Sequence, residues 1–175
     1  MDKFRRSGYS RIPCICGAVT VLSAHLAVAS TVTVPVRVTF VNPIAISKVS
    51  ALQFGSIDQN LVGSETVTVA PDSTVIDLAG RVEGGPQAAA SLTITASPGH
   101  IITIFVDSVV SGAGYSLTDF RCKYNAGSDG ACDGVGYSAT SVASSKLLVG
   151  ATLTGDGTAE AGVVDGSLYI TIIYQ

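Results

Sequence analysis

A regular alternation of apolar and polar side chains runs through residues 31–41, which read TVTVPVRVTFV. Successive side chains of a β-strand point to opposite faces, so this spacing predicts a strand with one apolar face. Burying that face is worth about 8 to 15 kcal/mol in total, at about 1.5 to 3 kcal/mol per side chain. Because Pro35 cannot donate a ladder hydrogen bond, we expect an edge strand or an added strand rather than a central one. The apolar face consists of Val32, Val34, Val36, Val38 and Phe40.

Shorter alternations follow along the rest of the chain and are separated by turn residues. Gly84-Gly85-Pro86 reads as a loop, and no segment of ten residues holds a helical period. Many short strands joined by short loops are typical of an antiparallel β-sandwich, so we expect an all-β fold. The predicted strands are residues 44–46, 51–54, 65–69, 74–79, 91–96, 100–106, 115–124, 146–154 and 168–174.

The first 29 residues have the layout of a secretory signal peptide. Four basic residues precede an apolar run over residues 12–29, which closes on Ala27-Val28-Ala29. Small residues at these positions suit a signal peptidase, so we expect cleavage after Ala29 and an exported protein without a membrane span. The alternative is a membrane anchor, but Pro13 and His25 interrupt the apolar run.

The charge and length of the remaining 146 residues restrict the partners and the folds that we expect for them. They carry 6 basic and 12 acidic side chains, a net charge of about −6, whereas the whole chain has −3. Such an acidic chain does not favour a nucleic-acid partner. A chain of this length buries enough surface for a single sandwich core.

Two cysteines, Cys122 and Cys132, lie beyond the predicted cleavage site. In an exported chain this even count favours a disulfide, with two free thiols as the alternative. The short loop that it closes would add about 3 kcal/mol of stability in the chain-entropy model.

The sequence offers little for catalysis, and we expect no enzyme, metal or cofactor. His100 is the single histidine after residue 29, which leaves a hydrolytic triad with one candidate base. The acidic residues Asp129 and Asp133, with Asn125 and Ser128, could offer oxygen ligands to calcium. Their spacing does not match an EF-hand, and we interpret them as a solvated disulfide loop.

Several motifs carry a resemblance to a known class of proteins. They are Pro43-Ile44-Ala45-Ile46 leading to Leu52-Gln53-Phe54-Gly55, then Val67-Thr68-Val69 with Pro71, and a last strand ending in Ile173-Tyr174-Gln175. With them, the chain resembles small secreted fimbrillin-like domains of unknown function from bacteria. More distantly it is similar to the subunits of chaperone-usher pili, in which a Gly and a penultimate aromatic residue recur where Gly162 and Tyr174 stand here. The late, closely spaced cysteines depart from the usual pilin pattern.

The resemblance implies an immunoglobulin-like sandwich that lacks one strand and is completed by an N-terminal donor strand. Residues 1–29 would be the signal peptide, 30–41 the donor strand, and 42–175 the pilin-like domain. The groove that receives a donor would be formed by Gly162 and by the inward face of the last strand, Leu168, Ile170, Ile172 and Tyr174.

The implied function is that of a structural subunit of a surface fibre, which supports adhesion or biofilm formation. Its partners would be neighbouring copies or related subunits, a periplasmic chaperone and an outer-membrane usher. It would pass through the periplasm to the cell surface. The alternative is a self-contained secreted or surface sandwich, closed by its own N-terminal strand, that binds a glycan or a protein.

Overall fold

The computed structural model describes residues 35, 37–63, 65–110, 114–159, 161–162 and 166–175, with the side chains of 108–110 left out. The chain divides into two units, Met1–Val38 and Thr39–Gln175. In the first unit, the described residues Pro35, Arg37 and Val38 belong to no strand.

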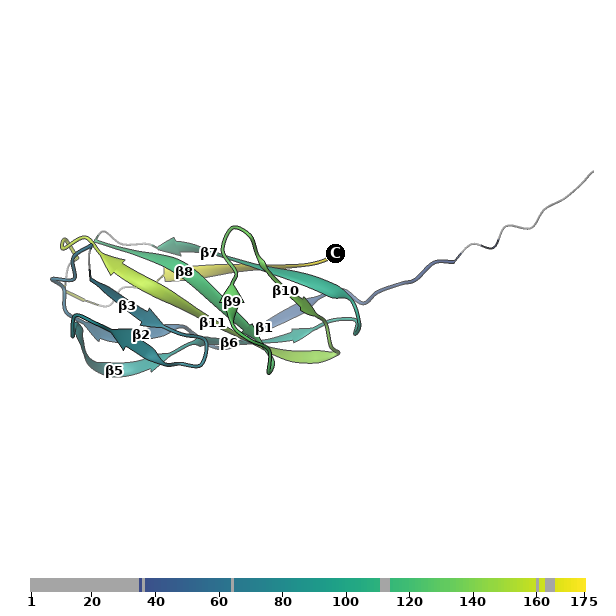
Figure 1. The fold of residues 1–175 in the computed structure, drawn as a ribbon, viewed down its shortest axis with the longest axis horizontal. Helices are drawn as coiled ribbons and strands as arrows, with labels where there is room; N and C mark the ends of the chain where they lie inside the picture. The colour runs from purple at the N-terminus through teal and green to yellow at the C-terminus, as the bar shows by residue number, and fades with distance from the viewer. Residues whose placement is uncertain (1–34, 36, 64, 111–113, 160, 163–165) are drawn as a thin grey trace, which may run out of the picture. The chain divides into compact units, whose positions relative to one another are not determined.

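The second unit is built from strands, and its described residues include no helix. Twelve strands follow one another in the described part (Figure 1): β1 Ala45–Ser50, β2 Gln53–Ile57, β3 Thr66–Val69, β4 Val75–Asp77, β5 Val82–Ala88, β6 Ala90–Thr95, β7 Ile101–Val110, β8 Tyr115–Tyr124, β9 Gly130–Ala131, β10 Tyr137–Thr140, β11 Ser144–Gly155 and β12 Gly166–Tyr174.

The long strand β11 organises the larger sheet, which we call sheet A. Its residues 144–149 pair with β6, and its residues 151–154 pair with β3. On its other side it pairs with β8 over nearly its whole length. β1 extends the sheet beyond β6, β4 extends it beyond β3, and β9 extends it beyond β8. Gly150 stands where β11 changes partner, and a Cβ there would collide with the carbonyl oxygen of Val69.

Two smaller sheets cover the inner face of sheet A. The order β10-β7-β12 forms sheet C, and β2 pairs with β5. The main core lies between sheet C and the strands β6, β8 and β11, and it includes Ile94, Ile102, Ile104, Leu147 and Val149, all fully buried. A second cluster of Leu61, Val67 and Leu153 is covered by side chains of β2 and β5. All pairings are antiparallel, so the predicted all-β sandwich is confirmed.

One predicted loop is a strand. Gly84-Gly85-Pro86 lies inside β5, which pairs with β2 across two register shifts. Pro86 is tolerated because β5 has only one neighbour in its sheet, so the ladder can omit one donor. Gly84 and Gly85 have positive φ angles of 149° and 80°, which fit an irregular strand.

The disulfide predicted between Cys122 and Cys132 is present, with a Cα–Cα distance of 5.7 Å. Both residues are fully buried, and the bond fastens β8 to the segment after β9. The carbonyl of Cys132 also accepts a 2.8 Å hydrogen bond from the amide of Val106 in β7. The disulfide loop therefore connects the two layers.

Candidate functional site: an open strand edge beside the chain exit

The most distinctive feature of the sandwich is the free edge of β12. All nine residues of this strand pair with β7 without a register shift. Among the described strands, β12 has no second neighbour. Its other edge is therefore open over the full length of the strand.

The hydrogen-bond pattern shows which backbone groups face this edge. The amide of Gln175 donates a 2.9 Å bond to the carbonyl of Ile101, which continues the β12–β7 ladder by one residue. In an antiparallel ladder hydrogen-bonded and non-hydrogen-bonded pairs alternate, so odd-numbered residues of β12 bond to β7. The N–H and C=O groups of the even-numbered residues, Leu168, Ile170, Ile172 and Tyr174, face outward along the open edge.

The side chains of the same four residues point into the sandwich but remain half-buried. Their neighbours on β7 are covered, since Ile102, Ile104 and Val106 are at most 1% exposed. The core side chains are thus fully buried at the centre of sheet C and only half-buried at its margin in β12. One more strand beside β12 would cover this apolar surface.

Other outer strands carry features that discourage pairing. β1 has a register shift between Lys48 and Ser50, and Lys48 pairs with the core residue Leu92, which puts its charge on the inner face. Inward charges and bulges are known protections of edge strands. β2 and β5 are irregular, and β4, β9 and β10 have two to four residues each. β12 contains no charge, no Pro and no bulge.

The folded unit begins at the C-terminal end of this edge. The Asn42 amide donates to Ser97 Oγ at 2.6 Å, and the Asn42 carbonyl accepts from the Tyr174 phenol at 2.9 Å. The phenol oxygen in turn accepts from the Ser97 amide at 2.7 Å. His100 packs edge-on against the ring of Tyr174, with ring centroids 5.6 Å apart. Both backbone polar groups of Asn42 are therefore held in place.

An open hollow of about 480 Å³ lies between residues 41–44 and the end of β12. Phe40, two residues before Asn42, is 92% exposed and does not line the hollow. The lining is mostly apolar and consists of Val41, Asn42, Pro43, Ile44, Ile172, Ile173 and Tyr174.

The structure brings together only some of the residues predicted for this site. Leu168, Ile170, Ile172 and Tyr174 share one face of β12, but Gly162 lies before this strand as an exposed bend residue. Val38 and Phe40 are exposed and outside any strand. Val32, Val34 and Val36 lie outside the described residues.

Asn42 and Ser97 were not predicted as site residues. The sequence marks both only as chain breaks, in Asn42-Pro43 and Ser97-Pro98-Gly99. Nothing local indicates that Tyr174, 132 and 77 residues away respectively, connects them.

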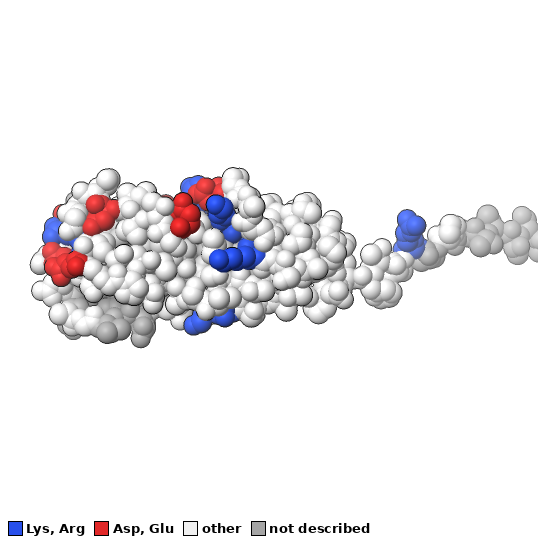
Figure 2. Space-filling view, turned by 90° about the horizontal axis from the view of Figure 1, so that it is seen from below, with Lys and Arg blue, Asp and Glu red and all other residues white. Residues whose placement is uncertain are grey.

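Charged groups are sparse and serve the scaffold. Much of the face in Figure 2 carries neither acidic nor basic side chains. Arg81 donates to both oxygens of Glu65 at 2.8 and 2.7 Å and to Asp58 at 2.8 Å. The Arg81 hydrogen bonds lower the pKa of Glu65. The pKa of Asp58 is lowered chiefly by the amide of Asn60 and further by Arg81. This ion-pair cluster joins the end of β2 and the start of β3 to the start of β5.

Within the part of the chain that the structure describes, no three His, Cys, Asp or Glu side chains group as metal ligands would. No helix of that part is long and apolar enough to cross a membrane.

Residues 44–174 match the family model described as Domain of unknown function (DUF4402). This range contains all of the strands from β1 to β12 and thus the open edge. No curated protein and no solved structure matches the chain.

Proposed function

We propose that this chain, which belongs to the family described as Domain of unknown function (DUF4402), is a structural subunit of a bacterial surface fibre. Its subunits would join by strand addition at the open edge of β12. The observation that carries the proposal is the combination of nine unprotected edge residues with a half-covered apolar face on the same strand. A long, uncharged and regular edge is a template for pairing with another chain.

The added strand is residues 31–41. In this segment Val32, Val34, Val36, Val38 and Phe40 alternate with mostly polar residues, as a strand with one covered face requires. Its apolar side would cover Leu168, Ile170 and Ile172, and its backbone would bond the outward N–H and C=O groups of these residues. Strand addition of this kind draws affinity from the backbone and specificity from alternate side chains.

The position of Asn42 favours a strand from a neighbouring copy. Asn42 lies at the C-terminal end of β12, so the chain's own residues 31–41 could run beside β12 only parallel to it. They would also have to reverse direction at Asn42, whose amide and carbonyl are both held. A strand from a second copy meets neither restriction and can pair antiparallel, the slightly more stable arrangement. Such a head-to-tail contact does not close on itself and builds a fibre.

A surface fibre built in this way requires export of the subunit and partners that assist its assembly. Residues 1–29 direct the chain out of the cytoplasm, and N-terminal sequencing of the exported protein should begin at Ser30. An uncovered β12 edge is an aggregation hazard before assembly. A periplasmic chaperone that covers it and an outer-membrane usher that exchanges it for the next subunit would meet this need.

The test is deletion of residues 31–41 from the exported protein. The deletion variant keeps the open edge but offers no strand, so we expect soluble fibres or detergent-resistant ladders on gels to disappear. A synthetic peptide TVTVPVRVTFV should bind the variant and keep it soluble. A peptide of the same composition with the alternation scrambled should not bind.

A deletion variant that stays monomeric, soluble and indifferent to the peptide would refute strand addition. A full-length protein that is monomeric at all concentrations would favour the self-contained sandwich instead.

A further inference from the structure

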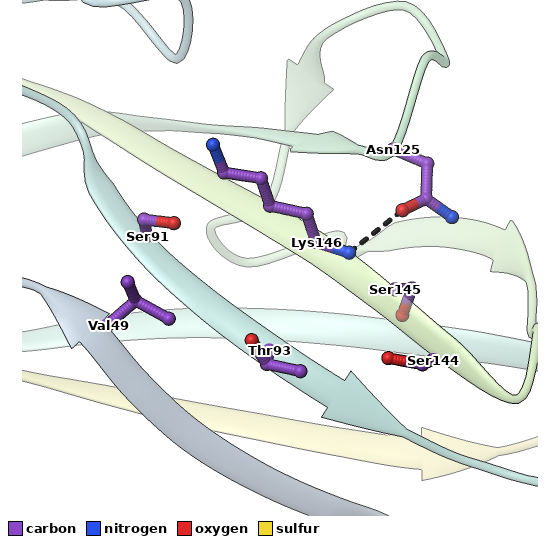
Figure 3. A pocket seen from close by; sticks show the side chains of 7 residues that line it. All are labelled: Val49, Ser91, Thr93, Asn125, Ser144, Ser145 and Lys146. Atoms are coloured by element: carbon purple, nitrogen blue, oxygen red, sulfur yellow. Dashed lines mark hydrogen bonds between the residues drawn. The ribbon is translucent and has the colours of Figure 1, made fainter.

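The outer face of sheet A carries a second hollow, of about 390 Å³, away from the core and independent of strand addition. Its volume lies within the usual range of small-molecule sites, about 300 to 1,000 Å³. It is formed by β1, β6 and β11 together with Asn125, which follows β8 (Figure 3). The base of the hollow is rigid because the hydrogen-bonded ladder fixes the backbone positions of residues that lie side by side on neighbouring strands. Thr93 and Lys146 are such a directly paired couple.

Ser91 lines this hollow with a buried hydroxyl that has no partner. The residue is 7% exposed, and its Oγ makes no hydrogen bond within the described structure. Ser145, which also lines the hollow and is 5% exposed, donates to the carbonyl of Ile94 at 3.2 Å. Buried hydroxyls are normally paired, so Ser91 stands out as a group prepared for a ligand.

Lys146 supplies a cation to the same hollow. Its ammonium makes no ion pair with any described carboxylate. Its backbone amide donates to Asn125 Oδ1 at 2.8 Å, which orients that amide side chain and leaves its NH₂ group as a donor. In Figure 3 the side chains of Ser91 and Lys146 lie toward one end of the hollow, with Thr93 between them and Ser144.

Val49 gives the hollow one apolar wall. This side chain is 66% exposed at the β1 margin, where it adjoins Ser91 and Thr93. A ligand that uses the whole hollow therefore needs hydroxyl groups for Ser91, Thr93 and Ser144, one negative charge for Lys146, and a C–H surface for Val49.

We infer that this hollow binds a sugar acid, a pyranose ring that carries several hydroxyls and a single carboxylate, as a uronic acid unit does. A single ammonium without a neighbouring guanidinium matches a carboxylate. A Lys ammonium also binds phosphate as a point charge, but an Arg fork or a helix N-terminus adds the several N–H donors that favour phosphate over a carboxylate, and the lining of this hollow includes neither.

The test is a titration of the full-length protein with glucuronate, glucose and inorganic phosphate, followed by NMR chemical shifts or calorimetry. We expect glucuronate to bind with a Kd of about 1 to 10 mM and to shift resonances of Ser91, Thr93 and Lys146. Glucose and phosphate should each bind at least about tenfold more weakly than glucuronate, since glucose lacks the carboxylate and phosphate lacks the sugar ring with its hydroxyls. Lys146→Gln should weaken glucuronate binding about tenfold and leave glucose binding unchanged. Lys48→Gln is the matched control, because Lys48 projects to the opposite face of sheet A.

Ser91→Ala separates a ligand role from a structural one. The substitution removes a buried hydroxyl without a partner, so the unfolding temperature should stay the same or rise while glucuronate binding falls about fivefold. Ser145→Ala should lower the unfolding temperature because it breaks the bond to Ile94. The inference is overturned if glucuronate gives no saturable shift, if glucose or phosphate binds as tightly as glucuronate, or if Ser91→Ala unfolds at a lower temperature with unchanged affinity.

Discussion

The phenol of Tyr174, at the end of β12, donates a 2.9 Å hydrogen bond to the carbonyl of Asn42, 132 residues earlier in the chain. Its oxygen also accepts from the amide of Ser97, a residue that is 8% exposed. One side chain therefore joins the exit of the N-terminal segment, the turn between β6 and β7, and the end of the open edge. The position of Asn42, near the start of the second unit, depends on this contact.

Tyr174→Phe should destabilise the folded unit by about 1 to 2 kcal/mol. The substitution keeps the ring against His100 but leaves the Ser97 amide without a partner in a buried position. Urea unfolding measures the change. Tyr169→Phe is the control, since Tyr169 is exposed on the other face of β12 and should unfold like the unchanged protein. Equal midpoints for both variants would contradict the proposed role of Tyr174.

Val36→Asp should abolish fibre assembly and leave the folded unit intact. In an added strand, Val36 faces the apolar side of the neighbouring β12, where burial of a carboxylate costs on the order of several kcal/mol. Thr39→Asp puts the same charge in the same segment but on the opposite face, so it should assemble normally. Electron microscopy of fibres and thermal unfolding of monomers provide the two measurements. Equal assembly defects in both variants would exclude an alternating docking face.

Removal of the disulfide should lower the free energy of unfolding by about 3 kcal/mol, since the bond closes a short loop in the unfolded chain. The double variant Cys122→Ala/Cys132→Ala should show this loss in urea. Alkylation of the unchanged protein without a reductant should label neither thiol, because both are bonded and buried. Labelling of both would show that the exported protein carries free thiols.

Arg81→Gln should destabilise the folded unit at neutral pH but have little effect in acid. The pKa values of Asp58 and Glu65 are lowered in the folded state, so their pairing stabilises the fold above their ordinary values. This stability is lost as the pH falls below about 4 and the carboxylates become protonated. The difference in urea midpoint between Arg81→Gln and the unchanged protein should therefore shrink from pH 7 to pH 3. A constant difference would assign the effect to packing rather than to charge.

Local alternation was enough to predict most of the long strands. The predicted segments 115–124, 146–154 and 168–174 lie in β8, β11 and β12, and the segment 100–106 lies in β7 except for its first residue. Side-chain direction in a strand follows from neighbouring residues alone. The same alternation placed Leu168, Ile170, Ile172 and Tyr174 on one face. The prediction was wrong at Gly84-Gly85-Pro86, because these residue types are typical of a loop. Pairing of β5 with β2 makes this segment part of a strand.

The sequence by itself thus determined the class of fold, the apolar faces and the cysteine pair that could bond. Only the tertiary structure decided which strands pair, since β11 divides its edge between β6 and β3, and these contacts join residues that are far apart in the chain. It also decided that β12 rather than β1 is the unprotected edge, and that Asn42 is fixed beside Tyr174. The reason is physical: alternation is a property of neighbouring residues, whereas pairing, burial and edge exposure depend on the energy of the whole packed sheet.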